Sequence, residues 1–235
     1  MAQMSKIRLI VLVLLLFLFN RPVEAHHYNH LIESELALKV YSFDKDIQSW
    51  AQEHRNSNSD WLSKQARGFG EMKYTGSVLG VMYFTAKNNG NEKMRRTAVM
   101  GVESMLTANV ITGTIKLLAH RSRPRESESP YNWGGPSLSK EHVSFPSQHA
   151  ATAFSVATVI ATEYHDKPYV SHIMYGLATL TALSRVNDNE HWASDVAVGS
   201  LIGYYTAKHV VHSKCSKNDS SSGASALIMP VIKKF

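Results

Sequence analysis

The chain has 235 residues, of which 44% are hydrophobic and 19% are charged. This composition is typical of a folded protein with a sizeable core and excludes an intrinsically disordered chain. The formal net charge of +6 suits an anionic ligand or an anionic membrane face, and we expect no nucleic-acid partner.

The first 25 residues have the pattern of a secretion signal. Lys6 and Arg8 supply a positive start, Leu9 to Phe19 form an apolar run, and Val23-Glu24-Ala25 resembles a small-x-small cleavage site. The apolar run would make only about 16 Å of helix, against a membrane hydrocarbon core of about 30 Å. We therefore predict that residues 1–25 are a cleaved signal peptide and that the mature protein is periplasmic or secreted.

Beyond this signal, apolar residues recur at helical spacing in several segments, and strand-like alternation is rare. The predicted helices span 31–55, 71–88, 92–119, 148–164, 168–186 and 192–212. Charged residues interrupt each apolar segment, so we predict no membrane-spanning helix after residue 25. The pattern predicts an all-α, single-domain bundle of about six or seven helices over residues 26–212, followed by a flexible tail over 213–235.

The connection from His120 to Pro146 is rich in proline and glycine and cannot continue a helix. It is long for a connection inside a compact domain, and such loops are often functional. The segments with candidate chemistry flank this loop or follow it.

The first candidate segment runs from Lys116 to Pro124. Lys116 and Arg123 are seven residues apart, so the two cations lie on one face if the helix continues to Arg123. A guanidinium fork and an ammonium point charge together suit a tetrahedral oxyanion. By itself, the segment more often indicates a solvated basic helix end.

The second segment, Ser144 to His149, precedes an apolar helix. Pro146 is predicted in the first turn, and the free backbone amides after it are suited to phosphate. Ser147 can add a hydroxyl donor or cap the helix, and His149 can give a proton near neutral pH. Helix capping alone explains this segment equally well.

In the third segment, Ser184 to Asp195, His191 and Asp195 are four residues apart on the predicted last helix and can meet on one face. A carboxylate that accepts a hydrogen bond from Nδ1–H leaves Nε2 of the imidazole as a nucleophile. A surface ion pair at this spacing is equally frequent. Metal ligation is disfavoured because the chain has no HExxH motif and no pair of cysteines.

Together, the three segments resemble the signature of the type 2 phosphatidic acid phosphatase superfamily: K-x6-R-P, P-S-G-H and S-R-x5-H-x3-D. That superfamily also contains bacterial non-specific acid phosphatases and vanadium haloperoxidases. Ten defined positions match: Lys116, Arg123, Pro124, Pro146, Ser147, His149, Ser184, Arg185, His191 and Asp195. One position departs, because Gln148 stands where the family usually has glycine; it keeps the backbone amide and adds a side chain over the pocket.

The resemblance implies a metal-independent phosphatase acting on phosphate monoesters or on lipid phosphates and pyrophosphates, and the predicted signal peptide implies that it is exported. It implies that His191, oriented by Asp195, forms a phosphohistidine and that His149 protonates the leaving group. No metal or other cofactor is required, and peripheral contact with a membrane is left open. The residues implied to bind the phosphoryl oxygens are Lys116, Arg123, Ser147, the amide of Gln148, and Arg185.

Two other functions fit the same residues. A vanadium-dependent haloperoxidase would hold vanadate through His191, although such enzymes are much longer than this chain. A non-catalytic module that binds phosphate or lipid headgroups would result if Gln148 blocked the pocket.

Overall fold

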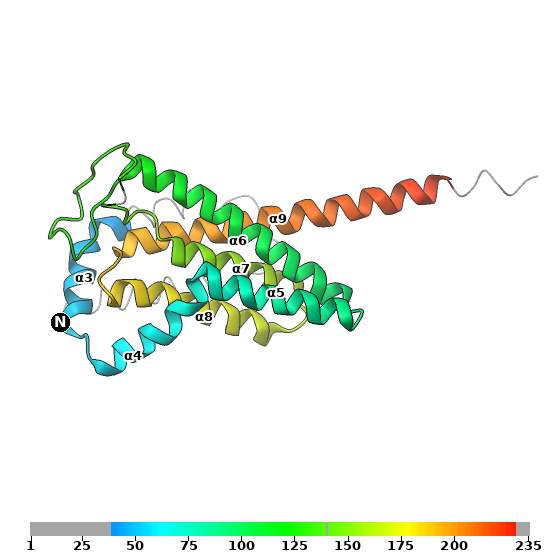
Figure 1. Cartoon of the computed structure of the whole chain (residues 1–235), viewed down its shortest axis with the longest axis horizontal. Coiled ribbons are helices and arrows are strands. Elements are labelled where there is room, and N and C mark those ends of the chain that lie inside the picture. The colour runs from blue at the N-terminus through cyan, green and yellow to red at the C-terminus, as the bar shows by residue number, and fades with distance from the viewer. Residues whose placement is uncertain (1–38, 140, 229–235) are drawn as a thin grey trace, which may run out of the picture.

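The computed structural model describes residues 39–139 and 141–228, and these residues form a bundle of helices (Figure 1). No strand occurs in this part of the chain, which confirms the predicted all-α bundle. The predicted signal peptide over 1–25 lies outside the described residues. The elements in chain order are α3 (Asp44–Glu53), α4 (Ser57–Ala66), the 3-10 helix η1 (Arg67–Gly70), α5 (Met72–Asn88), α6 (Glu92–Ala119), α7 (Gln148–Glu163), α8 (Pro168–Asn187) and α9 (Ala193–Ile228).

The predicted helix boundaries are accurate for α5, α6, α7 and α8, where apolar periodicity is long and unbroken. The last helix differs from the prediction. α9 continues to Ile228, past residue 212, through most of the segment predicted as a flexible tail. Extending an existing helix requires no new nucleus, so even a serine-rich segment can prolong it. The division of the chain into a signal, a domain and a tail stays a prediction.

Helix α4 and the 3-10 helix that follows it were missed by the sequence-based prediction. Helix α4 is polar, and its start is set by a cap instead of an apolar stripe. The Asn56 side chain accepts hydrogen bonds from the amides of Asn58 and Ser59 at 3.0 and 3.1 Å. The Ser59 hydroxyl accepts one from the Asn56 amide at 3.0 Å, which completes a capping box.

Helix α7 is the central element, because it packs against α6, α8 and α9. Its alanine-rich sequence is buried on nearly all faces, and the small side chains let its neighbours approach closely. Phe154 of α7 lies in a core cluster with Val186 and Val196. Contacts with α7 therefore hold the end of α6 and the start of α9 beside the start of α7.

Glycine allows α9 to approach α7 most closely. A Cβ atom at Gly203 would lie 2.3 Å from the carbonyl oxygen of Ala151 and 2.9 Å from the amide nitrogen of Ser155. Both atoms belong to the backbone of α7 and cannot turn aside. The contact therefore requires glycine at this position.

We expect Gly203→Ala to lower the free energy of unfolding by about 1–3 kcal/mol, because the two helices must separate. Gly80→Ala is the matched control: a Cβ at Gly80 meets nothing within 4 Å, and alanine favours the helix by up to about 1 kcal/mol. Thermal unfolding of the two variants beside the parent protein measures the difference. Equal effects of both substitutions would contradict the close α7–α9 contact.

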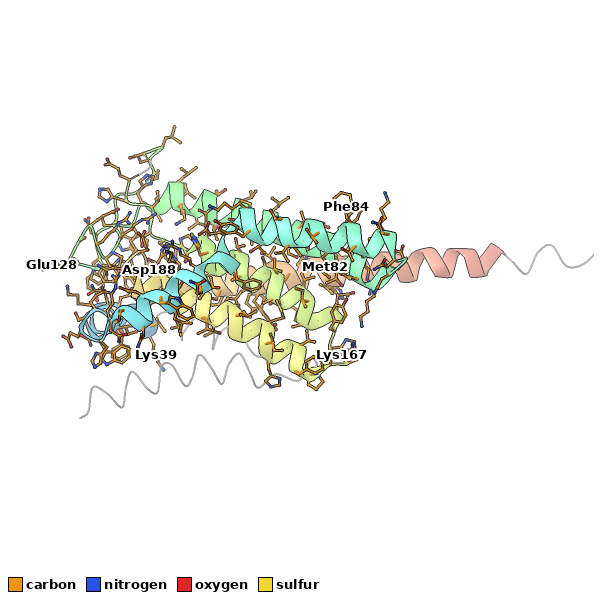
Figure 2. All side chains as sticks on the ribbon, turned by 60° about the horizontal axis from the view of Figure 1, so that its bottom comes forward. Lys39, Met82, Phe84, Glu128, Lys167 and Asp188 are labelled. Carbon is orange, nitrogen blue, oxygen red and sulfur yellow. The ribbon has the colours of Figure 1, made fainter. Side chains whose placement is uncertain are left out.

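The outward sides of α5, α6 and α8 carry many exposed apolar side chains. On α5 they recur at helical spacing, with Val78, Val81 and Phe84 each more than 60% exposed. Figure 2 shows Phe84 on the outside of the bundle. The exposed apolar side chains of α6 and α8 are Val99, Leu106, Val110, Ile111, Leu117, Leu118, Tyr169, Ile173, Leu177, Leu180 and Leu183. We call the outward sides of α5, α6 and α8 the outer apolar surface.

Among the described residues, one helix, α6, is long and apolar enough to cross a membrane, a test that buried core helices also pass. This differs from the prediction, which treated Glu103 and Lys116 as interruptions of the apolar run. Glu103 is paired with Lys214 of α9 at 2.9 Å, so its charge is balanced within the bundle. Lys116 is buried at the end of the helix.

Candidate active site

The three motif segments meet at one end of the bundle. The long loop after α6 lies at this end together with α3 (Figure 1). Asp188, which follows α8, and Glu128 of the loop lie there as well, whereas Lys167 before α8 lies at the other end (Figure 2). The end of α6, the start of α7 and the start of α9 therefore face one region.

Lys116 and Arg123 reach this region in different ways. Helix α6 ends at Ala119, as predicted, and His120 adopts the left-handed conformation with φ of 41°. The condition under which Lys116 and Arg123 would share one helical face is therefore not met. Pro124 also disfavours helical backbone at Arg123. Lys116 is buried at the end of α6, and its Nζ donates to the carbonyl oxygens of Val143 and Ser144 at 2.5 and 3.2 Å.

The second segment forms the start of α7. Ser147 is its N-cap, and the serine hydroxyl accepts from the Ala150 amide at 3.5 Å. Pro146 lies before the cap and not in the first turn as predicted. The Gln148 side chain lies against α6, where its Nε2 is 3.8 Å from the place that a Cβ on Gly113 would take. This distance is an ordinary van der Waals contact, so a methyl group at Gly113 would also leave room for the glutamine.

His149 follows in the first turn of α7 and lies close to several charges. Burial lowers the pKa of His149 to about 4, and the positive charges of Arg185, Lys116 and Arg123 act in the same direction. Glu71 opposes them. The imidazole is therefore surrounded mainly by cations, and a bound anionic ligand would neutralise their charge.

His191 and Asp195 are brought together, but not on one helix as predicted. His191 precedes α9, which begins at Ala193, and Asp195 lies in its first turn. Nδ1 of His191 is 3.6 Å from Oδ2 of Asp195 and has no hydrogen-bond partner within the described part of the chain. Burial lowers the pKa of His191 to about 3 against the effect of Asp195, so the imidazole is neutral at physiological pH.

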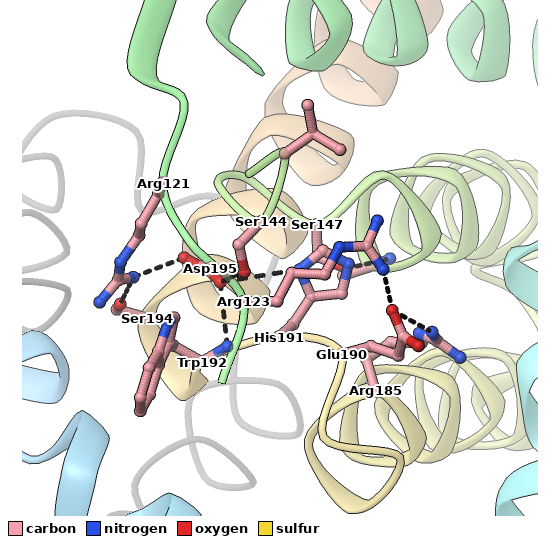
Figure 3. Close-up of polar contacts among 12 residues, drawn as sticks. Arg121, Arg123, Ser144, Ser147, Arg185, Glu190, His191, Trp192, Ser194 and Asp195 are labelled. Carbon is pink, nitrogen blue, oxygen red and sulfur yellow. Dashed lines mark hydrogen bonds and ion pairs between the residues drawn. The ribbon is translucent and has the colours of Figure 1, made fainter. Parts of the chain in front are cut away.

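Arg123 and Arg185 share a carboxylate that the sequence-based prediction did not include. Glu190 contacts Arg123 and Arg125, and its Oε2 lies 4.0 Å from NH2 of Arg185. Figure 3 shows Glu190 between Arg123 and Arg185. Both arginines were predicted to bind phosphoryl oxygens, so the carboxylate occupies the place of an anion.

We expect Glu190→Gln to strengthen binding of orthovanadate, a mimic of a phosphoryl group in transfer, by about 3- to 10-fold, because the arginines lose a competing anion. Calorimetric titration with orthovanadate measures this change. Glu126→Gln is the matched control, since Glu126 lies 4.0 Å from Arg123 and 3.9 Å from Arg125 and should change the affinity less. Weaker vanadate binding in the Glu190 variant would mean that this carboxylate organises the arginines and does not compete with the ligand.

The sequence-based prediction gave no role to several residues around Asp195. Arg121, Ser144 and Trp192 belong to the quoted segments but had been given no role, and each donates a hydrogen bond to the Asp195 carboxylate. Asp44 lies far upstream, and no local pattern connects it with the site. Among the described residues, no three His, Cys, Asp or Glu side chains are grouped so that they could hold a metal ion.

Comparison with known proteins agrees with this arrangement. The model of the PAP2 superfamily matches residues 98–218, slightly more than half of the chain. The chain belongs to the PAP2 superfamily. This PAP2 match contains all three motif segments and confirms the resemblance inferred from them.

Named relatives extend the comparison. A 61-residue stretch is 46% identical to the lipid A 1-phosphatase of Porphyromonas gingivalis and covers 26% of this chain but only 14% of that protein. The crystal structure of LpxE from Aquifex aeolicus superposes with a TM-score of 0.56 at 20% identity over 71% of this chain and 93% of its own. The transmembrane PAP2-type phosphatidylglycerolphosphate phosphatase of Bacillus subtilis superposes with a TM-score of 0.57 at 17% identity over 86% and 98%. At these identities the two structures share the PAP2 fold with this chain.

Proposed function

We propose that this PAP2 protein is a metal-independent lipid phosphatase that works at a membrane and forms a phosphohistidine at His191. The observation that carries the proposal is the convergence of two histidines, a carboxylate and three cationic side chains at one end of the bundle. The charges of Lys116 and Arg185 act on both His149 and His191, which supports a shared site for these four groups. Such a cluster suits in-line phosphoryl transfer without a metal ion.

In the first step, Nε2 of His191 attacks phosphorus, and the bond between phosphorus and the leaving oxygen breaks. Burial keeps the pKa of His191 low, so its lone pair is available. His149 gives its proton to the leaving oxygen. In the second step, His149 accepts a proton from water, the resulting hydroxide attacks phosphorus, and the bond to Nε2 breaks to release phosphate.

The cations have a separate role in this scheme. Lys116, Arg123 and Arg185 neutralise the phosphoryl oxygens, and Ser147 and the amide of Gln148 add donors at the start of α7. Positive charge from α6, the loop and α8 would thus balance the negative charge that develops in transfer. Glu190 would have to lose its contacts with Arg123 and Arg185 when the substrate enters.

The outer apolar surface supports a lipid substrate. Monomeric soluble proteins rarely expose large continuous apolar patches, whereas contact with lipid acyl chains is favourable for such residues. On α8, the sequence from Pro168 to Ser184 contains no Asp, Glu, Lys or Arg. The relatives named above act on lipid A and on phosphatidylglycerolphosphate, according to their names. We infer that the phosphoryl group of a membrane lipid reaches the charged end of the bundle while the apolar sides remain in contact with lipid.

The test measures phosphate release by the full-length protein in mixed micelles, with and without a chelator. The substrates are phosphatidic acid, phosphatidylglycerolphosphate, lipid A and the soluble ester p-nitrophenyl phosphate. We expect release from at least one lipid, faster than from the soluble ester. Release that stops on addition of chelator would contradict the metal-independent mechanism, and halide oxidation with added vanadate and peroxide in place of hydrolysis would favour a haloperoxidase.

A further inference from the structure

Arg121 is a completely buried cation beside the proposed nucleophile. Its NH1 donates to Oδ1 of Asp195 at 2.5 Å, and its NH2 donates to Oδ2 of Asp44 at 2.7 Å. All three side chains have no exposed surface. One guanidinium group therefore joins the start of α3 to the start of α9.

The other contacts of Arg121 leave it no freedom to turn. Nε and NH2 both donate to the carbonyl oxygen of Pro130, at 2.9 and 2.8 Å, and NH1 also donates to the hydroxyl of Ser194 at 2.8 Å. The rings of Tyr41, Trp133 and Trp192 lie 5.1, 4.9 and 5.5 Å from the guanidinium carbon. A planar fork held at each nitrogen determines where its partner carboxylates lie.

Asp44 is held as firmly as Arg121. The amide of Ser194 donates to Oδ1 of Asp44 at 2.8 Å, and the hydroxyl of Ser194 donates to Oδ2 at 2.5 Å. The amide belongs to the first turn of α9, where backbone donors have no partner inside the helix. Asp44 thus caps the first turn of α9 from a different part of the chain, and it also accepts the hydrogen bond that NH2 of Arg121 donates.

Asp195 is oriented by donors other than His191. Oδ1 accepts from Arg121, while Oδ2 accepts from the Ser144 hydroxyl at 2.5 Å and from the Trp192 amide at 2.9 Å. Figure 3 shows Asp195 between Arg121 and His191. The carboxylate is therefore in place before His191 changes its charge.

A carboxylate buried in this way needs a cation, because burial by itself favours the neutral acid. Burial would raise the pKa of Asp195, but His191, Arg121 and Ser144 outweigh it, and the pKa is lowered. With Asp44 and Asp195 both ionised, two carboxylates and one guanidinium leave one net negative charge in the cluster; burial raises the pKa of Asp44, and Arg121 and Ser194 oppose this effect. This charge faces the imidazole, which becomes positive when Nε2 bonds to phosphorus.

We propose that Arg121, held by Asp44, is a positioning residue that keeps Asp195 ionised and directed at Nδ1 of His191. The proposal rests on the proposed function, in which His191 is the nucleophile. Arg121 does not touch the reacting atoms and acts through the carboxylate. Its loss should therefore slow the chemical step and have little effect on substrate binding.

A purely structural role makes a different prediction. If Arg121 only anchored the loop through the Pro130 carbonyl oxygen, its loss would disturb the approach of Arg123 and raise KM, with kcat less affected. Comparison of kcat with KM therefore separates the two roles. Arg96→Gln is the matched control, because Arg96 pairs with the buried Glu163 at 2.7 Å, at the start of α6 and the end of α7, away from the site.

The experiment compares the kinetics of full-length Arg121→Gln, Arg121→Lys, Asp44→Asn and Arg96→Gln, with thermal unfolding as a check of folding. We expect kcat to fall about 100-fold in Arg121→Gln and about 10-fold in Asp44→Asn, with KM within about 3-fold of the parent value. Arg121→Lys keeps the charge but not the fork and should recover part of the loss. Arg96→Gln should lose stability and keep its kcat. An unchanged kcat in Asp44→Asn and Arg121→Lys, or a rise in KM alone, would overturn the proposal.

A second measurement does not depend on turnover. Nitrogen NMR of histidine-labelled protein, with the His191 signals assigned by their loss in His191→Ala, reports which ring nitrogen carries the proton. We expect the proton on Nδ1 in the parent protein and a mixture of tautomers in Arg121→Gln and Asp44→Asn. If the parent protein hydrolyses no substrate, the proposed function fails, and the tautomer decides the role of Arg121. An unchanged tautomer in both variants would then exclude that role.

Discussion

His191→Ala is expected to reduce kcat for phosphate release by at least about 10⁴-fold while the bundle stays folded, because the step that forms the phosphoenzyme loses its nucleophile. His191 lies between α8 and α9 and is not part of either helix, so its removal leaves the helix contacts in place. Steady-state phosphate release, with thermal unfolding measured in parallel, tests this expectation.

The same variant provides a direct chemical test. Parent protein mixed with a phosphorus-labelled substrate and quenched in alkali should retain an acid-labile label on histidine, and His191→Ala should retain none. His165→Ala serves as the control, because His165 is exposed and lies after α7, at the far end of that helix from His149. Label retained in the His191 variant would show that another group is the nucleophile.

His149→Ala is expected to have the second largest effect, and the effect should depend on the leaving group. A lipid alkoxide is a poor leaving group and needs a proton, so kcat/KM should fall about 10²- to 10⁴-fold. The phenolate released from p-nitrophenyl phosphate needs little assistance, so kcat/KM for this ester should fall much less. Equal losses with both substrates would contradict the role of His149 as a general acid.

The pH dependence gives an independent test of His149. A general acid must be protonated, so activity falls as the pH rises through its pKa. Burial, assisted by Arg185, lowers that pKa to about 4 in the free protein, and a bound phosphoryl anion offsets the cations that contribute. The basic limb of kcat/KM, which reports the free protein, should therefore lie near pH 4, and that of kcat should lie at higher pH. Both limbs should be absent in His149→Ala.

The sequence predicted those parts of the fold in which a long apolar pattern determines the structure. Helix α7 is rich in alanine and other apolar residues and was located to within a residue, whereas the polar α4 depends on the cap at Asn56 and was missed. The end of α6 at Ala119 was predicted correctly, whereas the left-handed backbone of His120 that ends the helix was not foreseen. Local pattern carries no information about such a turn.

The groups proposed to react were named from the sequence, and their roles stay predictions, whereas the residues that support them were missed. Lys116, His149 and His191 stand in motifs with regular spacing, and the fold brings them together. Glu190 directly precedes His191, yet nothing in the spacing indicates that it faces two arginines. Asp44 lies 150 positions before its partner Ser194, and only the folded chain reveals this pairing.

The contact of Asp44 with Arg121 and Ser194 has a consequence for any attempt to isolate the catalytic part of the chain. A fragment confined to residues 98–218 would contain every motif, but the first turn of α9 would lose its external cap and one arm of Arg121 would lack its carboxylate. Transfer of the three motifs into another helical scaffold would likewise carry over the reacting groups without Asp44, which holds Arg121 and the start of α9. The smallest portable unit therefore begins before Asp44, well upstream of the segment by which the family is recognised.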